Sequence, residues 1–224
     1  MMPPLSHVVA FDEATHTYRD TGGVIQPSVT TVLHAVGLVN GDRYTDEARD
    51  RGTLIHKLAR VHLETIAGGA PGKALGMLAV AGERGVHGYL SGFVNYINER
   101  QLTPLAIERP MRDPLLCYAG TPDLIAKDRR GAVGVLDIKS GSIERWHKVQ
   151  VEAYARLASH AHGPITWRVI LYVRANGTAR AVTVPPADWV TADQVWLAAL
   201  RVYRTRQLWA RTDEEWRRAN ADDV

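Results

Sequence analysis

Two acidic residues and one lysine are the first candidates for chemistry in this sequence. The segments Gly120-Thr121-Pro122-Asp123 and Leu136-Asp137-Ile138-Lys139 each place charge in a hydrophobic stretch typical of a β-strand. Because side chains alternate along a strand, Asp137 and Lys139 point to one face, and the Ile138 carbonyl stays in the plane of the sheet. Two carboxylates and a carbonyl oxygen form a hard-oxygen site suited to Mg²⁺ or Mn²⁺.

A surface ion pair on an edge strand is the alternative interpretation of Asp137 and Lys139. An Asp-X-Lys triplet arises by chance about once in a chain of this size. The flanking apolar residues favour a buried site, because a charge inside a buried strand needs a partner or a metal ion. Asp123 shares a face with Asp137 only if the loop between their strands has an odd number of residues, such as 128–130 or 128–132, or if a bulge intervenes.

The elements that must position these groups follow from the spacing of apolar and turn-forming residues. We expect an N-terminal hairpin and short helix within 1–40, a helical part over 44–101, a sheet over 104–184 and a C-terminal helix over 190–219. Short strands are predicted near 8–11, 17–19 and 24–25, and long helices over 44–66 and 86–100, the first ended by the glycine-rich segment 68–72.

The predicted sheet contains a three-strand meander over 104–113, 117–127 and 132–139. A crossover helix over 144–160 and a hairpin around Asn176-Gly177 follow it. This order predicts an α/β fold with a single mixed β-sheet flanked by helices, forming one domain over residues 1–224.

Composition limits the class of protein. The 224 residues include 27 Lys and Arg against 24 Asp and Glu, a net charge of +3, and 46% are hydrophobic. Such values are typical of a folded globular chain and exclude a collagen-like or disordered one. A small positive charge permits nucleic-acid binding without indicating a site. No signal peptide is expected in residues 1–15, and no membrane span in the uncharged run 21–41, which polar residues, Gly and Pro interrupt.

Taken in order, the motifs of the chain resemble the PD-(D/E)XK nuclease superfamily, in particular its RecB-like branch as found among bacteriophage exonucleases. The resemblance covers most of the chain and rests on Phe11-Asp12 with His16-Thr17-Tyr18, Pro27-Ser28-Val29-Thr30, Arg51-Gly52 with His56, Glu108, Gly120 to Asp123, Asp137-Ile138-Lys139, and Gln150 with Tyr154. It implies a restriction-endonuclease-like core. It also implies one or two Mg²⁺ or Mn²⁺ ions as cofactors.

The resemblance assigns the metal ligands. They would be His56, Asp123, Asp137 and the backbone carbonyl of Ile138. His56 follows Gly52 by four residues, so both lie on one helical face, where the missing side chain of Gly52 leaves room for a close approach. Taken alone, a histidine at such a position is more often buried and hydrogen-bonded to backbone.

Glu108 belongs to a predicted alternating strand, on the same face as Ala106 and Pro110. An exposed glutamate is the more frequent case at such a position. The resemblance places this acid near the metal ions, where it would bind a second ion or position water.

Gln150 and Tyr154 are one turn apart and project from one side of their predicted helix. The resemblance implies that they contact a substrate phosphate or hold Lys139, and a partly exposed polar pair is the alternative. Arg51 belongs to a group of basic residues on the His56 helix, together with Arg49, Lys57 and Arg60. If this group lines a groove, it would bind phosphates, and the binding would weaken with salt. Some RecB-like proteins hold an iron–sulfur cluster on four cysteines, but this chain has only Cys117, so no such cluster is expected.

The predicted function is therefore a metal-dependent DNA exonuclease of phage or bacterial recombination or repair. Its predicted catalytic residues are Lys139, Glu108, Asp123, Asp137, Gln150 and Tyr154, and the nucleic-acid-binding residues are Arg51, Gln150 and Tyr154. The alternatives are a structure-specific DNA endonuclease and a non-catalytic nucleic-acid-binding or assembly module. Expected partners are DNA, a single-strand annealing or binding protein and a second copy of the chain. The expected location is the cytoplasm of a bacterial or phage-infected cell, without a membrane.

Overall fold

The computed structural model of the chain describes residues 9–40, 45–70 and 72–219, and leaves the side chains of 215–219 undescribed. The predicted strand residue Val8, the predicted helix start Tyr44, and Pro71 lie outside the described residues.

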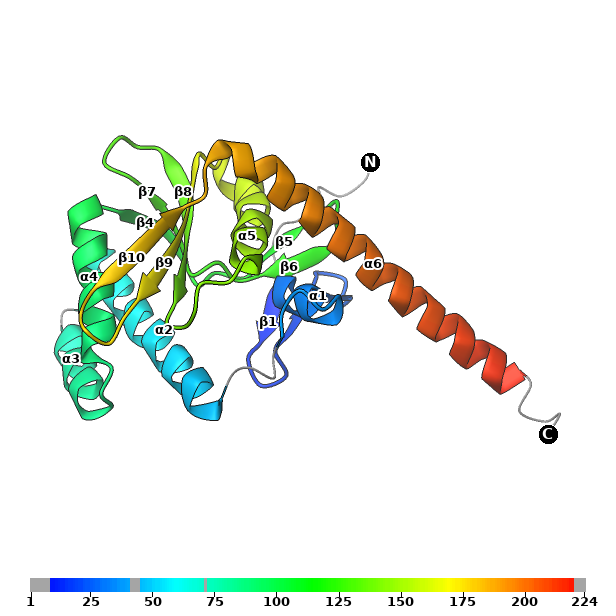
Figure 1. Cartoon of the computed structure of the whole chain (residues 1–224), viewed down its shortest axis with the longest axis horizontal. Helices are drawn as coiled ribbons and strands as arrows, with labels where there is room; N and C mark the ends of the chain where they lie inside the picture. The colour runs from blue at the N-terminus through cyan, green and yellow to red at the C-terminus, as the bar shows by residue number, and fades with distance from the viewer. Residues whose placement is uncertain (1–8, 41–44, 71, 220–224) are drawn as a thin grey trace.

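Within the described ranges the fold is mixed α/β, with six helices and ten strands (Figure 1). The helices are α1 (Val29–Ala35), α2 (Asp46–Ile66), α3 (Gly72–Glu83), α4 (His87–Arg100), α5 (Trp146–His162) and α6 (Pro186–Ala219). The strands are β1 (Ala10–Asp12), β2 (Thr17–Arg19), β3 (Ile25–Gln26), β4 (Thr103–Ile107), β5 (Met111–Asp113), β6 (Tyr118–Gly120), β7 (Leu124–Lys127), β8 (Val133–Lys139), β9 (Trp167–Val173) and β10 (Ala179–Thr183).

A five-stranded sheet in the order β10-β9-β8-β7-β4 forms the centre of the molecule. β8 and β9 run parallel and α5 connects them, as expected of a crossover helix, whereas the other neighbouring strands are antiparallel. The predicted hairpin at Asn176-Gly177 joins β9 to β10, and Gly177 supplies the positive φ of 84° that its turn requires. The expected mixed sheet flanked by helices is confirmed.

The expectation that the strands over 104–184 form a single sheet is wrong, because β5 and β6 lie outside the five-stranded sheet. β5 and β6 pair with each other in a separate two-stranded sheet, and β1, β2 and β3 form a third. Two of the predicted meander strands are each broken in two, one at Glu108 and one at Pro122. Glu108 takes a φ of 41°, outside the strand region, and Pro122 has no N–H to donate to a ladder. The remaining β4, β7 and β8 keep the expected meander order.

Helix α3 has no counterpart in the sequence prediction. Its sequence contains Gly72, Gly76 and Gly82, each of which lowers helix propensity. Only Met77 and Ala81 are buried, so its apolar stripe is too short to stand out as a helical pattern. The predicted short N-terminal helix does have a capping residue, since Ser28 Oγ accepts the N–H of Thr31 at the start of α1.

Alternating side chains divide the core into two layers on the two faces of the sheet. On β8, Val135 packs in the layer that contains α1, α5 and α6, whereas Leu136 and Ile138 pack in the layer of α2 and α4. Each buried aliphatic side chain contributes roughly 1.5–3 kcal/mol to folding. The odd-numbered residues Asp137 and Lys139 therefore lie on the α5 face of the sheet.

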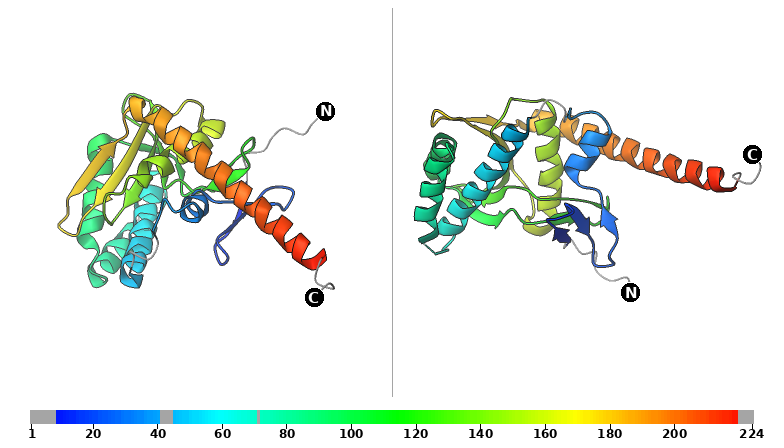
Figure 2. Two further views of the ribbon diagram at one scale, coloured as in Figure 1. Left: turned by 45° about the vertical axis from the view of Figure 1, so that its right-hand side comes forward. Right: turned by 90° about the horizontal axis from the view of Figure 1, so that it is seen from below.

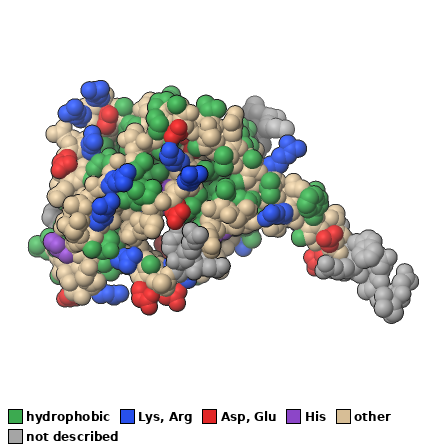
Figure 3. Space-filling model, viewed as in Figure 1, with side chains coloured by type: hydrophobic (Ala, Val, Ile, Leu, Met, Phe, Trp, Pro, Cys, Tyr) green, Lys and Arg blue, Asp and Glu red, His purple; other side chains and the backbone are tan. Residues whose placement is uncertain are grey.

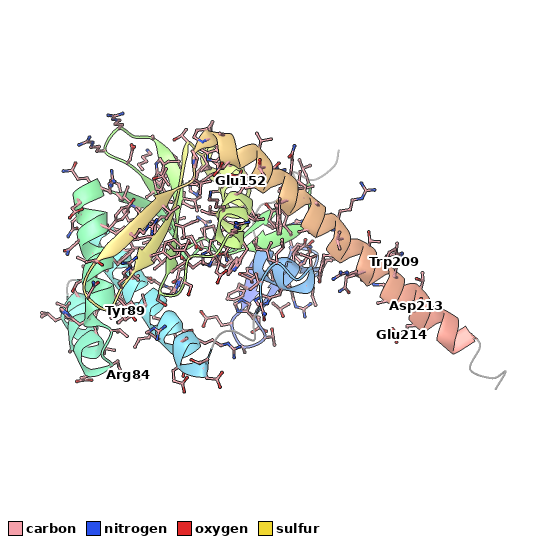
Figure 4. The ribbon with its side chains drawn as sticks, viewed as in Figure 1. Arg84, Tyr89, Glu152, Trp209, Asp213 and Glu214 are labelled. Carbon is pink, nitrogen blue, oxygen red and sulfur yellow. The ribbon has the colours of Figure 1, made fainter. Side chains whose placement is uncertain are left out.

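Helix α6 runs past the body, and its C-terminal part extends away from it (Figure 2). Its N-terminal half is anchored, because Trp196 is fully buried against Tyr118, with ring centroids 4.7 Å apart. Trp209 lies further out on the extending part and is 62% exposed (Figure 4). No helix in the described ranges combines the length and the apolar character needed to cross a membrane.

Candidate metal and nucleic-acid site

Asp123 lies directly before β7, and Asp137 lies on the neighbouring β8. The loop between β7 and β8 consists of residues 128–132, an odd number, and the last pair of the ladder, Leu124 with Leu136, directly precedes the positions of the two aspartates. Asp123 Oδ2 accepts the N–H of Ile138 at 2.6 Å. The condition that the sequence sets for a shared face is met by the odd loop.

Lys139 forms an ion pair with Asp137 beside the sheet. Its Nζ atom is 2.7 Å from Asp137 Oδ2. Asp137 is only 2% exposed, and burial raises its pKa to about 6, although the charge of Lys139 opposes the shift. Asp137 Oδ2 accepts no well-aligned hydrogen bond within the described residues, so this oxygen has capacity for another ligand.

His56 reaches the same group from α2. Its Nδ1 atom is 3.2 Å from Asp123 Oδ1. Burial lowers the pKa of His56, but the charge and the hydrogen bond of Asp123, with a smaller contribution from the charge of Asp137, together outweigh burial and raise this pKa. Burial raises the pKa of Asp123, whereas the charge and hydrogen bond of His56 lower it, and the net effect is a lowered pKa. The pair is therefore most stable with His56 protonated and Asp123 ionised.

Gly52 is not needed for this approach of α2. A Cβ atom added at Gly52 would lie 3.6 Å from Ser140 Oγ, an ordinary contact. The room that the sequence analysis attributes to the missing side chain is real, but an alanine would fit it too.

Glu108 follows β4 and lies beside Asp123, not within a regular strand. Its N–H donates to the carbonyl oxygen of Asp123 at 3.1 Å, and its Oε2 is 3.6 Å from Arg60 Nη1. Burial and the charge of Asp123 raise the pKa of Glu108. The predicted alternation with Ala106 and Pro110 is wrong, because β4 ends at Ile107 and the positive φ of Glu108 redirects the chain.

Gln150 and Tyr154 are buried side by side on α5. They are 3% and 6% exposed, and Gln150 Nε2 donates to Tyr154 Oη at 3.2 Å. A Cβ atom at Gly120 would lie 2.8 Å from Tyr154 Cε1, so a glycine on β6 is required for this packing. Burial and the charge of Asp137 raise the pKa of Tyr154 well above its usual value. Gln150 Oε1 is buried without a hydrogen bond among the described residues, and DNA contact by this pair stays a prediction.

Two cavities open beside His56. The first, of about 200 Å³, is lined by His34, Val39, Ala48, Arg51, His56, Ile138 to Ser142, Trp146 and His147. The second, of about 450 Å³, is lined by Phe11, Glu13, His16, Gly52, Thr53, His56, Lys57, Arg60 and Glu108. His56 thus lines both cavities, Lys139 the first and Glu108 the second, whereas the buried Asp137 and the neighbouring Asp123 line neither.

Arg51 enters the first cavity with hydrogen-bonding capacity unused. Its Nε atom is buried and has no hydrogen-bond partner in the described part of the chain. Its guanidinium lies 5.6 Å from the ring centroid of Tyr89 on α4 (Figure 4). Lys and Arg side chains elsewhere on the face drawn in Figure 3 are spread out and form no single basic patch. By its local geometry, Arg51 is therefore better placed to bind a phosphate than these scattered surface Lys and Arg side chains.

The donor types fit a hard divalent cation, but the side chains are paired within the protein. Asp123 pairs with His56 and Asp137 with Lys139. In the described ranges, no three His, Cys, Asp or Glu side chains are grouped as they would be around a metal ion. The residues that would hold an ion are His56, Asp123, Asp137 and the Ile138 carbonyl, with Glu108 beside them. Asp137 Oδ2, which apart from its ion pair with Lys139 accepts no well-aligned hydrogen bond within the described residues, is the observation that supports this fit.

No protein-family model matches the chain, and a search of curated proteins finds no match either. The site is therefore interpreted from its own residues.

Two supporting contacts were not anticipated from the sequence. Tyr18 Oη lies 2.8 Å from Thr121 Oγ1 and so ties the N-terminal hairpin to the segment that carries Asp123. On the other side, the Tyr172 hydroxyl lies 2.7 Å from His147 Nδ1 in the buried layer next to Lys139. The motif residue Tyr18 carried a signal for the first contact, whereas His147 stood in no pattern.

His147 predicts a pH dependence of stability. Its Nδ1 accepts the N–H of Glu144 at 3.3 Å, so the ring is held neutral, and burial together with Lys139 lowers its pKa to about 3. Below the unfolded-state pKa of about 6.5, His147 binds a proton in the unfolded chain but not in the folded chain. The free energy of unfolding therefore decreases as the pH is lowered. We expect His147 to remove about 2 kcal/mol of unfolding free energy between pH 7.5 and 5.

Urea denaturation of the wild type and of His147→Gln at both pH values measures this effect. The raised pKa of Asp137 acts in the opposite direction, but it is present in both proteins and cancels in the difference. If the difference in unfolding free energy between wild type and His147→Gln is the same at pH 7.5 and at pH 5, this result contradicts a neutral, buried His147.

Proposed function

We propose that this chain is a metal-dependent DNA exonuclease that hydrolyses phosphodiester bonds in phage or bacterial DNA recombination or repair. The observation that carries the proposal is the convergence of His56 from α2 with Asp123, directly before β7, and with Asp137 and Lys139 of β8. The resemblance of the ordered motifs to RecB-like nucleases supports it. On this proposal the five-stranded sheet with α5 is the restriction-endonuclease-like core.

A Mg²⁺ or Mn²⁺ ion held by His56, the two aspartates and the Ile138 carbonyl would activate water and neutralise charge on the scissile phosphate. Lys139 is the proposed proton-handling group, because its ammonium lies on the same face as Asp137 and lines the first cavity. It would orient the nucleophilic water and stabilise negative charge as it develops.

The other proposed roles follow from position. Glu108 would position water or bind a second ion, and Arg51 would bind a phosphate from the wall of the first cavity. Gln150 and Tyr154 would keep the α5 side of the site in register, since both are buried next to Asp137.

A non-catalytic nucleic-acid-binding module is the second candidate. It is favoured by the internal pairing of both aspartates with His56 and Lys139, which stabilises the fold without any ion. Salt-sensitive DNA binding without cleavage in Mg²⁺ or Mn²⁺ distinguishes it from a nuclease.

The deciding experiment is product analysis on end-labelled linear duplex DNA with added Mg²⁺ or Mn²⁺. We expect release of label as mononucleotides or short products from the ends, dependent on the ion and abolished by EDTA. Covalently closed circular DNA is the control, because it has no end. Its cleavage indicates an endonuclease, and intact linear DNA under all conditions contradicts the proposal.

A further inference from the structure

The second cavity has an aromatic wall that the proposed reaction does not use. Phe11 and His16, from the hairpin β1–β2, both line it. Their ring centroids are 5.0 Å apart with the planes nearly perpendicular, and Phe11 also packs on Tyr18 at 4.6 Å. Because Tyr18 bonds to Thr121, the rings are fixed relative to the segment that ends in Asp123.

His16 is held in an uncommon backbone conformation. Its φ of 52° lies in the left-handed region, which few non-glycine residues adopt, although histidine, asparagine and aspartate do so more often than others. Asp12 Oδ1 accepts the N–H groups of Ala14 and Thr15 and so fixes the turn before His16. The hairpin thus presents an exposed ring at the cavity.

Helix α2 contributes two basic side chains to the cavity, which Glu13 and Glu108 also line. Lys57 and Arg60 belong to α2, while His56 and Glu108 form the end nearest the aspartates. Arg60 is engaged by Glu64 at 2.8 Å, whereas Lys57 is exposed and has no ion pair among the described residues. A cavity with both aromatic rings and a cation suits a ligand with a flat heteroaromatic part and a phosphate.

We propose that the exposed ring of His16 stacks on the nucleobase of a terminal, unpaired nucleotide, that Phe11, nearly perpendicular to it, contacts the edge of the base, and that Lys57 binds the phosphate. The proposal rests on the proposed function, since it places the end of a DNA strand next to the aspartates. The volume of about 450 Å³ is within the range of small-ligand pockets and accommodates one nucleotide. A single-stranded end, and not the paired interior of a duplex, presents a base that both rings can reach.

Binding of single-stranded oligonucleotides in EDTA tests this proposal without hydrolysis. One set carries 2-aminopurine at the 5′ or the 3′ end, and a second carries an abasic residue at the same position. Wild-type protein is expected to bind the base-bearing end about 5- to 150-fold more tightly than the abasic end, by anisotropy, and to change the 2-aminopurine emission on stacking.

The double variant Phe11→Leu, His16→Asn removes both rings, and asparagine tolerates the left-handed conformation. We expect its preference for the base-bearing end to fall below about two-fold, with thermal unfolding close to wild type. Tyr96→Leu is the matched control, since Tyr96 lines another cavity, with Arg100 and Asp128, away from the aspartates. That variant should keep the wild-type preference.

Equal binding of base-bearing and abasic ends by the wild type overturns the proposal, as does retained preference in the double variant or the absence of any DNA binding. These outcomes are separable from the nuclease proposal. Cleavage of linear DNA without base preference leaves the nuclease standing, and base preference without cleavage in Mg²⁺ or Mn²⁺ refutes the nuclease while supporting this site.

Discussion

Asp137→Asn and Lys139→Met are each expected to lower the rate of Mg²⁺- or Mn²⁺-dependent DNA hydrolysis at least about 1,000-fold, equivalent to about 4 kcal/mol of transition-state stabilisation. Asparagine keeps the shape of Asp137 but removes the negative charge of the buried carboxylate that faces Lys139. Methionine keeps the length of Lys139 but removes the ammonium beside that oxygen. Initial rates on end-labelled linear duplex measure the effect.

The controls must separate lost chemistry from lost folding, because removing one partner of a buried ion pair also destabilises a protein. Lys148 and Asp188 form a pair of the same length, 2.7 Å, between α5 and α6, at side-chain exposures of 44% and 41%. Lys148→Met and Asp188→Asn are therefore matched substitutions outside the site and should retain activity. Wild-type rates in a folded Asp137 or Lys139 variant refute the assignment.

The pairing of the two aspartates was predictable from the sequence because it depends on local geometry. Strand alternation and the parity of a short loop decide whether Asp123 and Asp137 share a face, and the loop 128–132 has the required parity. The ion pair between Asp137 and Lys139 follows from the same alternation. Helix α2 also carries its own signals, an apolar stripe and a capping residue, Thr45.

The division into three sheets was not predictable by the same means. A hydrophobic run continues across Glu108 and across Pro122, so periodicity alone gives one long strand at each place. In the structure β4 instead ends at Ile107, directly before Glu108 with its positive φ, and β7 starts at Leu124, two residues after Pro122. Such breaks depend on tertiary packing, here on the backbone bond between Glu108 and Asp123, which no local pattern contains.

The partners of the site depend on contacts between distant segments. Tyr18 and Thr121 are 103 residues apart, and His147 and Tyr172 belong to a helix and a strand that meet only in the folded protein. The ordered motifs indicated that Tyr18 matters, but nothing in the sequence indicated what it touches.

The second large effect concerns the ion pair that anchors α5 to the sheet. Arg168 on β9 binds Glu152 through two hydrogen bonds, from Nε at 2.5 Å and from Nη2 at 3.0 Å. The residues are 7% and 4% exposed, and the guanidinium also lies 3.7 Å from the ring centroid of Trp189 on α6. Figure 4 labels Glu152 on α5, where it lies between Gln150 and Tyr154 in sequence but projects from the opposite side of the helix.

Arg168→Met is expected to lower the free energy of unfolding by about 3–5 kcal/mol, because it leaves the Glu152 carboxylate buried without its partner. The double variant Arg168→Met, Glu152→Leu removes both charges and should recover most of that loss, to within about 1–2 kcal/mol of wild type. Urea denaturation at pH 7.5 measures both. Since the pair faces away from Gln150 and Tyr154, the double variant should also keep nuclease activity at temperatures where it is folded. If Arg168→Met loses less than about 1 kcal/mol of unfolding free energy, this result contradicts a buried, mutually dependent pair. If the double variant is no more stable than Arg168→Met, Arg168 stabilises the protein through Trp189 instead.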